Sequence, residues 1–248
     1  ATLRVRDPLD SSAPVVELAQ SLEGNRVTAP LTLTGSIADT NLDRWTLSIV
    51  SLNGTVRRVL AQGDSAIGRG PLATLDPAQF TNGFYLVQLV ANDVAGRSST
   101  TQANVEIASQ AKSGYRRVEN DLDLQLAGQT FSLGRAYDSL AAANSTKFGF
   151  GWRLAQRDVM LQTDVPRTGR EASGNYSPLQ EESRLAVTLP DGQRVGFSFT
   201  PTRHELPGLT YYSPHWTADA GVAWTLESTA TKLVRGDGKF YDLLTAAP

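Results

Sequence analysis

Apolar residues recur at every second position along most of this sequence, in short runs separated by Gly, Pro, Asn and Asp residues. In Leu31–Ile37, for example, apolar side chains alternate with Thr and Ser, and Trp45–Ile49 repeats the pattern. Side chains of a β-strand point to alternate faces, so period-two runs predict half-buried strands, and the intervening residues predict tight turns. Almost no segment has the 3.6-residue period of an amphipathic helix. The sequence therefore predicts an all-β protein.

The region 14–108 predicts a β-sandwich. Seven short strands in about 95 residues are typical of an immunoglobulin or fibronectin topology, and the runs are 15–18, 31–37, 45–49, 56–61, 72–75, 84–91 and 101–107. Tyr85 follows Asn82-Gly83 at the start of a strand, where such sandwiches place a tyrosine corner, and Trp45 occupies the position of the core Trp of strand C. Residues 1–13 are predicted to be a linker or an edge strand.

The region 121–248 is also predicted to be β, after a polar linker at 109–120. Asp-Gly supplies the positive φ angles of tight hairpin turns, and it predicts two hairpins, namely 184–189 with 193–199 and 232–235 with 239–243. The aromatic, Pro-rich segment 204–220 is predicted to be a long loop. Because the chain stops at Pro248 directly after a strand, we expect a piece of a larger sheet.

Composition excludes several classes of function. Lys plus Arg number 23 and Asp plus Glu 25, giving a net charge of −2 and an isoelectric point near 5.7, so the chain has no bulk attraction for nucleic acid or anionic lipid. The pair Arg116-Arg117 is too small a basic patch for nucleic acid. Zero Cys excludes disulfides, thiol catalysis and Cys-ligated metals. No apolar run approaches the roughly 20 residues of a membrane span.

No catalytic constellation emerges, so the chain is predicted to be no enzyme, with no catalytic residue and no cofactor. His204-Glu205 begins like a zinc-protease helix, but the second His is absent and Pro207 breaks the helix. No Gly-x-Ser-x-Gly elbow occurs. The carboxylate pairs Asp121/Asp123 and Glu181/Glu182 are predicted to be solvated rather than glycosidic, since period-two spacing places Asp121 and Asp123 on one side. The adhesive tripeptide Arg235-Gly236-Asp237 falls on a predicted hairpin turn, which already gives these residues a structural role.

The segment Asp39-Thr40-Asn41-Leu42-Asp43 has the spacing of a calcium loop. Arg44 stands where an EF-hand requires Gly, and Val50 stands where it requires Glu, so an EF-hand is excluded. Two alternatives stay open: a calcium site at the end of the sandwich that includes Asp93, or a turn whose Asp and Asn side chains cap their own backbone. We assign no metal ligand.

The most specific motif lies in Thr130–Leu154 and consists of two phrases, Arg135-x-Tyr137-Asp138-Ser139 and Phe148-Gly149-x-Gly151-Trp152. It resembles the opening segment of Rhs/YD-repeat proteins, and the resemblance extends over Asp121–Leu243. The first half separately resembles bacterial Ig-like repeats. The glycines of the motif allow a sharp bend, and its rings, at about 150–250 Å² each, are expected to bury a large apolar area at the corner of a curling sheet.

The resemblance implies a structural role. Rhs/YD-repeat proteins build a hollow β-shell that, in toxin members, encloses a C-terminal toxic domain, and a preceding domain often caps one end. The expected fold is thus an Ig-like sandwich followed by antiparallel hairpins of an incomplete shell. The expected partners are the rest of the shell, the enclosed domain and a secretion-machinery or surface partner of a secreted or cell-surface-delivered bacterial protein. The family's self-cleaving aspartyl site and tandem repeats have no match here.

The alternative is a binding module for glycans or a cell-surface protein. Its sugar-stacking platform would consist of Tyr211, Tyr212, His215 and Trp216. A structural wall predicts no saturable ligand, whereas a binding module predicts a sugar signal that depends on Trp216.

Overall fold

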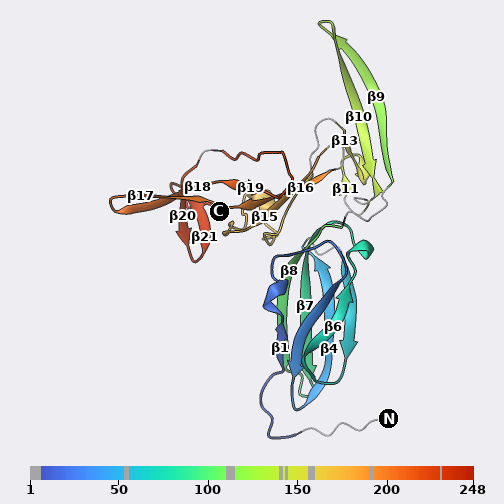
Figure 1. Cartoon of the computed structure of the whole chain (residues 1–248), viewed down its shortest axis with the longest axis vertical. Helices are drawn as coiled ribbons and strands as arrows, with labels where there is room; N and C mark the ends of the chain where they lie inside the picture. The colour runs from blue at the N-terminus through green and yellow to red at the C-terminus, as the bar shows by residue number, and fades with distance from the viewer. Residues whose placement is uncertain are drawn as a thin grey trace. The chain divides into compact units, whose positions relative to one another are not determined.

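The computed structural model describes residues 7–52, 56–109, 115–139, 142, 145–155, 160–189, 193–229 and 231–248. The chain divides into two compact units, Ala1–Lys112 (unit 1) and Ser113–Pro248 (unit 2). Both units consist of strands joined by turns, and the described helices are single 3-10 turns (Figure 1). Nearly all neighbouring strands are antiparallel. The predicted all-β fold class is confirmed.

Unit 1 is a two-sheet sandwich. One sheet has the order β1-β3-β6, which are Val15–Leu18, Leu31–Ala38 and Ile67–Leu75. The other has the order β2-β8-β7-β4-β5, which are Asn25–Val27, Ser98–Ile107, Gly83–Asp93, Leu42–Ser51 and Arg57–Gly63. The incoming chain thus contributes β1 to one sheet and then β2, parallel to β8, to the other. This topology is of the immunoglobulin type, although the alternation pattern did not indicate the short β2.

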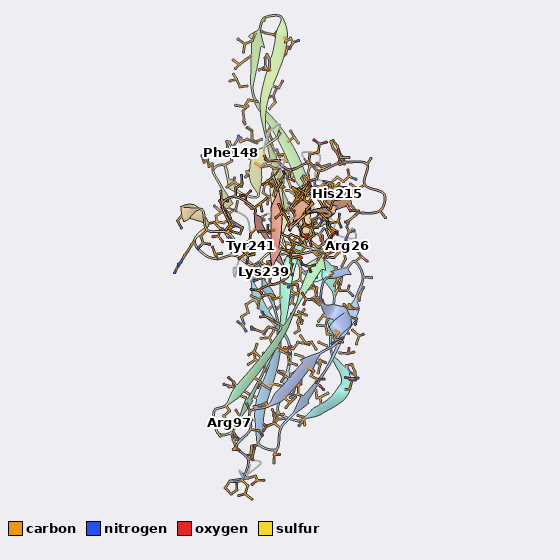
Figure 2. All side chains as sticks on the ribbon, turned by 90° about the vertical axis from the view of Figure 1, so that its left-hand side faces the viewer. Arg26, Arg97, Phe148, His215, Lys239 and Tyr241 are labelled. Carbon is orange, nitrogen blue, oxygen red and sulfur yellow. The ribbon has the colours of Figure 1, made fainter. Side chains whose placement is uncertain are left out.

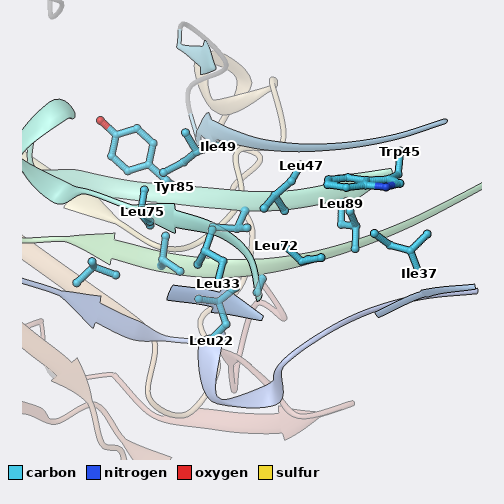
Figure 3. Close-up of a cluster of buried hydrophobic side chains, with 14 of the residues drawn as sticks. Leu22, Leu33, Ile37, Trp45, Leu47, Ile49, Leu72, Leu75, Tyr85 and Leu89 are labelled. Carbon is cyan, nitrogen blue, oxygen red and sulfur yellow. The ribbon is translucent and has the colours of Figure 1, made fainter. Parts of the chain in front are cut away.

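Alternation along the strands produces the core of unit 1. Figure 3 shows side chains of both sheets converging on one apolar layer, among them Leu33 and Ile37 from β3 and Leu47 and Ile49 from β4, all at most 1% exposed. The polar residues between them lie on the other side of each strand, where Thr32, Thr34 and Ser36 are at least partly exposed and Ser48 of the central strand β4 is buried. Because the two apolar faces close on each other, unit 1 has its own complete core.

Trp45 and Tyr85 occupy the two sandwich positions that the sequence indicated. The buried Trp45 donates its indole N–H to the Ser65 carbonyl at 3.1 Å. The Tyr85 hydroxyl, near the start of β7, donates to the Thr81 carbonyl at 2.9 Å, and its ring packs edge-on against Phe80 with centroids 6.0 Å apart. This hydrogen bond to the residue four positions upstream has the geometry of a tyrosine corner.

The described strands of unit 2 form four smaller sheets. The sheet β13-β10-β9 comprises Trp152–Leu154, Gln129–Asp138 and Arg116–Leu126, and β11 (Ser145–Thr146) pairs with β12 (Gly149–Phe150). The sheet β14-β15-β16-β19 comprises Met160–Thr163, Arg184–Thr188, Arg194–Phe199 and Trp216–Ala218. The sheet β17-β18-β20-β21 comprises Thr202–Leu206, Leu209–Ser213, Leu233–Gly236 and Lys239–Asp242.

The buried part of unit 2 is small. Val187, Val195 and Phe197 form one apolar cluster on β15 and β16. Phe199 and Phe240 join two of the sheets, since their ring centroids lie 5.5 Å apart in an edge-on arrangement. Both rings are buried. This aromatic contact is what unites the last eight strands, β14 to β21, around a shared interior.

Both predicted hairpins are present. β15 pairs with β16, although the predicted turn 190–192 lies outside the described residues. β20 pairs with β21 around Asp237 and Gly238, whose φ angles are 50° and 77°. Two successive positive φ angles are what a type I′ turn requires, and an Asp-Gly sequence supplies them at the lowest steric cost. The tripeptide Arg235-Gly236-Asp237 therefore lies in a hairpin.

The segment 204–220, predicted to be a loop, is instead mostly strand, and that prediction is wrong. β17 and β18 form a tight hairpin around Pro207-Gly208, with Gly208 at a φ of 79°. β19 follows after Ser213. The signal was the Pro-Gly pair between two alternating segments, because Pro207 and Gly208 are typical residues of a tight turn.

The predicted linker 109–120 also differs from the structure. The unit boundary falls at Lys112, but β9 already begins at Arg116 and runs to Leu126. The first half of β9, residues 116–120, is polar apart from Val118, so its sequence lacks the apolar alternation that indicated the other strands. A strand that is exposed to solvent on both faces can have a polar sequence, and such a sequence resembles that of a linker.

Candidate functional site

The resemblance motif assembles into one local structure, which we call the β10–β13 corner: Arg135, Tyr137, Asp138, Ser139, Gly149, Gly151 and Trp152. The pairing of β10 with β13 sets Tyr137 opposite Trp152, and their ring centroids lie 5.3 Å apart. Tyr115 adds a third ring, 6.1 Å from Tyr137. The two phrases of the motif are therefore cross-strand neighbours, although a loop separates them in the sequence.

Arg135 links the corner to β9. Its guanidinium donates two hydrogen bonds to the Asp121 carboxylate, from Nε at 2.7 Å and from Nη2 at 2.8 Å, while its Cζ lies 5.2 Å from the Trp152 ring centroid. These hydrogen bonds lower the pKa of Asp121 below its ordinary value and raise that of Arg135. A planar guanidinium can make the paired bonds and the ring contact together, which an ammonium cannot.

Asp138 and Ser139 close the base of the β9–β10 hairpin. The Asp138 carboxylate accepts a hydrogen bond from Arg116 Nε at 3.3 Å. The Ser139 hydroxyl accepts one from the Tyr115 backbone N–H at 2.8 Å, and the Ser139 N–H donates to the Tyr115 carbonyl at 3.0 Å. The Asp-Ser part of the motif thus fixes the point at which β9 starts opposite the end of β10.

The two motif glycines meet backbone requirements. Gly149 and Gly151 have φ angles of 102° and 73°. A Cβ on Gly151 would lie 2.8 Å from the Tyr137 ring and 3.0 Å from the Asp138 carbonyl oxygen. The Gly151 carbonyl accepts the Asp138 N–H at 2.9 Å. Only glycine fits here, because both the space and the left-handed backbone exclude a side chain.

Phe148 does not take part in the packing that the sequence led us to expect. Phe148, labelled in Figure 2, is 41% exposed, and Phe150, two positions further on, is 65% exposed. The β11–β12 turn is held instead by Thr146, whose hydroxyl accepts the Phe148 N–H at 3.0 Å and donates to the Trp152 carbonyl at 2.5 Å. The partly buried rings of the corner are those of Tyr137 and Trp152, while Tyr115, 60% exposed, contacts Tyr137 from outside.

The β9–β10 hairpin above the corner is exposed on both faces, as the side chains along it in Figure 2 illustrate. Direct pairing of Leu122 with Leu133 and of Leu124 with Phe131 places these residues on one face. We call this set the apolar hairpin face; it comprises Leu122 (46% exposed), Leu124 (47%), Leu126 (56%), Phe131 (53%) and Leu133 (45%). Large exposed apolar patches on soluble proteins often mark interaction surfaces, which makes this face a candidate for one.

The opposite face of the hairpin is satisfied by its own polar contacts. Asp123 accepts hydrogen bonds from Asn120 Nδ2 at 2.9 Å and from Ser132 Oγ at 2.6 Å, which lower its pKa. Gln125 donates to Thr130 Oγ1 at 2.6 Å. One face is therefore suited to water, while the other leaves its leucines uncovered within the described chain.

A carboxylate cluster lies at the end of the sandwich that Arg97 marks in Figure 2. Ligand atoms of Asp10, Asp39 and Asp93 lie within 4.8 Å of one another. The sequence singled out Asp39, Asn41, Asp43 and Asp93; Asp43 is not in the cluster, and Asp10 was missed because it lies in the predicted linker.

The guanidinium of Arg97 forms ion pairs with two carboxylates of the cluster. Arg97 contacts the Asp93 carboxylate at 2.5 Å through Nε and Asp10 Oδ2 at 3.2 Å through Nη2. Buried Asn41 donates to the Asp7 carbonyl at 3.0 Å and to Asp10 Oδ2 at 2.9 Å. The cluster therefore fastens the segment 7–12 to two strand connections, and we call this arrangement the clasp. The Asp-Asn turn also caps its own backbone, because the Asp39 carboxylate accepts the Asn41 N–H at 2.7 Å.

The four residues of the alternative sugar platform lie in different surroundings. Tyr211 stacks on His204 with centroids 4.8 Å apart, and Lys232 Nζ lies 5.0 Å from its ring centroid. Tyr212, on the other face of β18, packs against Phe240, and Trp216 packs against Phe199. His215 forms a hydrogen bond with Thr200. These rings contact protein groups and do not form one exposed platform.

Comparison with known proteins identifies no relative, since no family model and no curated protein matches this chain. Among the described residues, no helix has the length and apolar character needed to cross a membrane. Function therefore has to be inferred from the corner, the hairpin and the clasp.

Proposed function

We propose that this chain is a non-catalytic structural portion of a bacterial Rhs/YD-repeat toxin. In this proposal, unit 1 is a capping domain, and the strands from β9 onward begin the wall of a β-shell that encloses a C-terminal toxic domain. The whole polypeptide would be secreted or delivered at the cell surface. The remaining shell and the enclosed domain would be its principal partners.

The observation that carries the proposal is the β9–β10 hairpin with its anchoring corner. The strands β10 and β9 have ten and eleven residues, yet beyond the buried β10 residues near the corner neither face of the hairpin is covered within the described chain. An isolated two-stranded ribbon is at best marginally stable in water, so a hairpin of this length calls for neighbouring strands. A wall that grows by successive hairpins supplies them, because each hairpin covers the edge of the previous one.

The corner supports the same proposal through its rigidity. Arg135, Tyr137 and Trp152 fix the base of the hairpin by an ion pair, a cation–π contact and ring packing. A wall that begins from a fixed base has a defined direction, whereas a flexible base would leave the register of the next strand open. The motif residues would thus act by shape, with no chemical step assigned to them.

Electron cryo-microscopy of the full-length polypeptide that carries this chain tests the proposal. We expect a hollow β-container whose wall includes β9 and β10, with the apolar hairpin face covered by neighbouring strands. A β9–β10 hairpin that stands uncovered in solvent, with no container attached, would contradict the proposal. A glycan array on the same protein provides the control, because a saturable sugar signal lost in Trp216→Ala would favour the binding module.

A further inference from the structure

The outer edge of β9 is open. β9 is the last strand in the order β13-β10-β9, and in the part of the chain that the structure describes it pairs only with β10. Along an open edge, backbone N–H and C=O groups of alternate residues point away from the sheet and can pair with another strand. The edge is eleven residues long, enough for an added strand of ordinary length.

The side chains beside this edge differ sharply between the two faces. Leu122, Leu124 and Leu126 lie on the apolar hairpin face, each about half exposed. An added strand would place every second side chain next to these leucines. Apolar side chains at those positions would bury leucine surface that the described chain leaves in water.

The other face carries a carboxylate, that of Asp123, for which the described residues supply no cation. The hydrogen bonds that Asp123 accepts come from neutral groups, the Asn120 amide and the Ser132 hydroxyl. Asp121, the extra residue of a bulge in β9, pairs instead with Arg135, which lies on the same side of β10 as Leu133, so the expectation that Asp121 and Asp123 share one side is wrong. Asp123 lies between Leu122 and Leu124 in the strand and therefore faces away from them. A basic side chain on the added strand, directly across from Asp123, would supply the missing charge.

We propose that β9 binds an added β-strand whose side chains alternate between apolar and basic, with the apolar ones extending the Leu122–Leu126 face and a basic one facing Asp123. The proposal rests on the proposed function and gives the chemistry of the strand that would continue the wall. A second copy of this chain is a poorer occupant in the registers that set its Asp123 across from Asp123, because like charges across a strand pair are destabilising.

Synthetic peptides with blocked ends test this on the whole chain. A fluorescent Val/Lys alternating peptide of about nine residues matches the edge. A Val/Glu peptide keeps the apolar face but reverses the charge, and a Ser/Lys peptide keeps the charge but removes the apolar face. We expect saturable binding of the Val/Lys peptide by fluorescence anisotropy, and binding at least about tenfold weaker for each of the others.

Two variants test whether the peptide contacts Asp123. Asp123→Asn is expected to weaken binding of the Val/Lys peptide about two- to fivefold, the range of a single exposed ion pair. Glu17→Gln is the matched control, because Glu17 is an exposed carboxylate on β1, an edge strand of unit 1, and its removal should leave binding unchanged. Amide hydrogen exchange of the wild-type chain with peptide should show added protection on β9, which requires no variant to fold.

Several results would overturn the inference: no binding of the Val/Lys peptide, equal binding of the Val/Glu peptide, an unchanged affinity in Asp123→Asn, or protection that appears away from β9. These outcomes are distinct from a failure of the proposed function. Binding at β9 in a protein that forms no container would refute the shell and leave the inference standing, whereas a container without peptide binding would refute the inference alone.

Discussion

Within the clasp, the same surroundings favour the ionised form of some carboxylates and oppose that of another. The clasp contains three carboxylates and one guanidinium, Arg97. Asp10 and Asp93 have lowered pKa values: for Asp10 the largest cause is its hydrogen bonds from Ser12, and for Asp93 the hydrogen bonds from Arg97 outweigh the effect of burial. Asp39 has a raised pKa, because burial and then the charges of Asp10 and Asp93 disfavour its ionised form. The cluster therefore holds one carboxylate whose charge is unfavourable at neutral pH.

The substitution Asp39→Asn is expected to stabilise unit 1 at pH 7. A carboxyl group with a raised folded-state pKa binds its proton more tightly in the native protein, so ionisation costs stability at any pH above that value. Asparagine removes this cost and keeps the oxygen that accepts the Asn41 N–H. Thermal denaturation should show a midpoint a few degrees higher at pH 7 and no difference below the ordinary pKa of 3.8.

Asp39→Ala is the control for that prediction, because it removes the charge and the hydrogen-bond acceptor together. Its midpoint at pH 7 should lie below that of Asp39→Asn. A lower midpoint for Asp39→Asn than for the wild type would show that the carboxylate is needed in its charged form.

Gly151→Ala is expected to destabilise unit 2. A non-glycine residue in the left-handed region costs about 1–2 kcal/mol, and here the new Cβ would also meet the Tyr137 ring at 2.8 Å. Gly174→Ala is the matched control, because Gly174 has a similar φ of 78° with no atom within 4 Å of the added Cβ. Urea denaturation should show a larger loss for Gly151→Ala, and equal losses would mean that the corner adjusts freely.

At the scale of elements, the β9–β10 hairpin depends on side-chain contacts at its base rather than on a core. Because hydrogen bonds from Arg135 lower the pKa of Asp121, the pair stabilises the hairpin at neutral pH and loses this effect as the pH falls through that lowered pKa. Arg135→Lys removes the paired hydrogen bonds and the flat contact with Trp152.

We therefore expect faster amide hydrogen exchange in β9 for Arg135→Lys at pH 7. Exchange in β15 and β16, which contain the separate Val187–Phe197 cluster, should be unchanged and serves as the internal control. Unaltered protection of β9 would show that backbone pairing alone holds the hairpin.

The elements differ in how far the sequence predicts them. Alternation predicts β3 and β4 because one face of each strand is buried, and Asp237-Gly238 predicts its hairpin because the turn demands positive φ angles. The first half of β9 was missed, since it is polar apart from Val118 and lacks apolar alternation. Alternation also shows which face of a hairpin is apolar, but whether anything covers that face depends on contacts distant in sequence.

The candidate sites, too, were predictable only where their residues lie close together in the sequence. The corner was recognisable because its residues form a compact phrase in the sequence. The clasp was only half recognisable: Asp39 and Asp93 were candidates, but Asp10 joins them through Arg97, which is 87 positions away from it. A local pattern cannot encode such a pairing.

For the whole molecule, the two units have unequal interiors. Of the buried apolar residues in the described chain, 20 lie in unit 1 and 7 in unit 2. Buried apolar area is the main stabilising contribution to folding, so unit 1 should unfold at a higher temperature. Scanning calorimetry is expected to show two transitions.

Tyr85→Phe assigns these transitions. The variant loses the hydrogen bond to the Thr81 carbonyl, which costs about 1 kcal/mol and lowers the midpoint of a unit of this size by about 4–8 °C. Only the upper transition should move. A shift in both transitions would show that the two units unfold together.

The clasp has a mechanical consequence. Without it, tension on the leading segment would peel β1 from β3 one residue at a time, starting at the Val15–Ala38 pair. Because Asp7 and Asp10 are tied to Asn41 and Arg97, the load passes instead into two separate strand connections at once. Several hydrogen bonds must then break together, so the sandwich resists a pulling force that would otherwise separate β1 from β3.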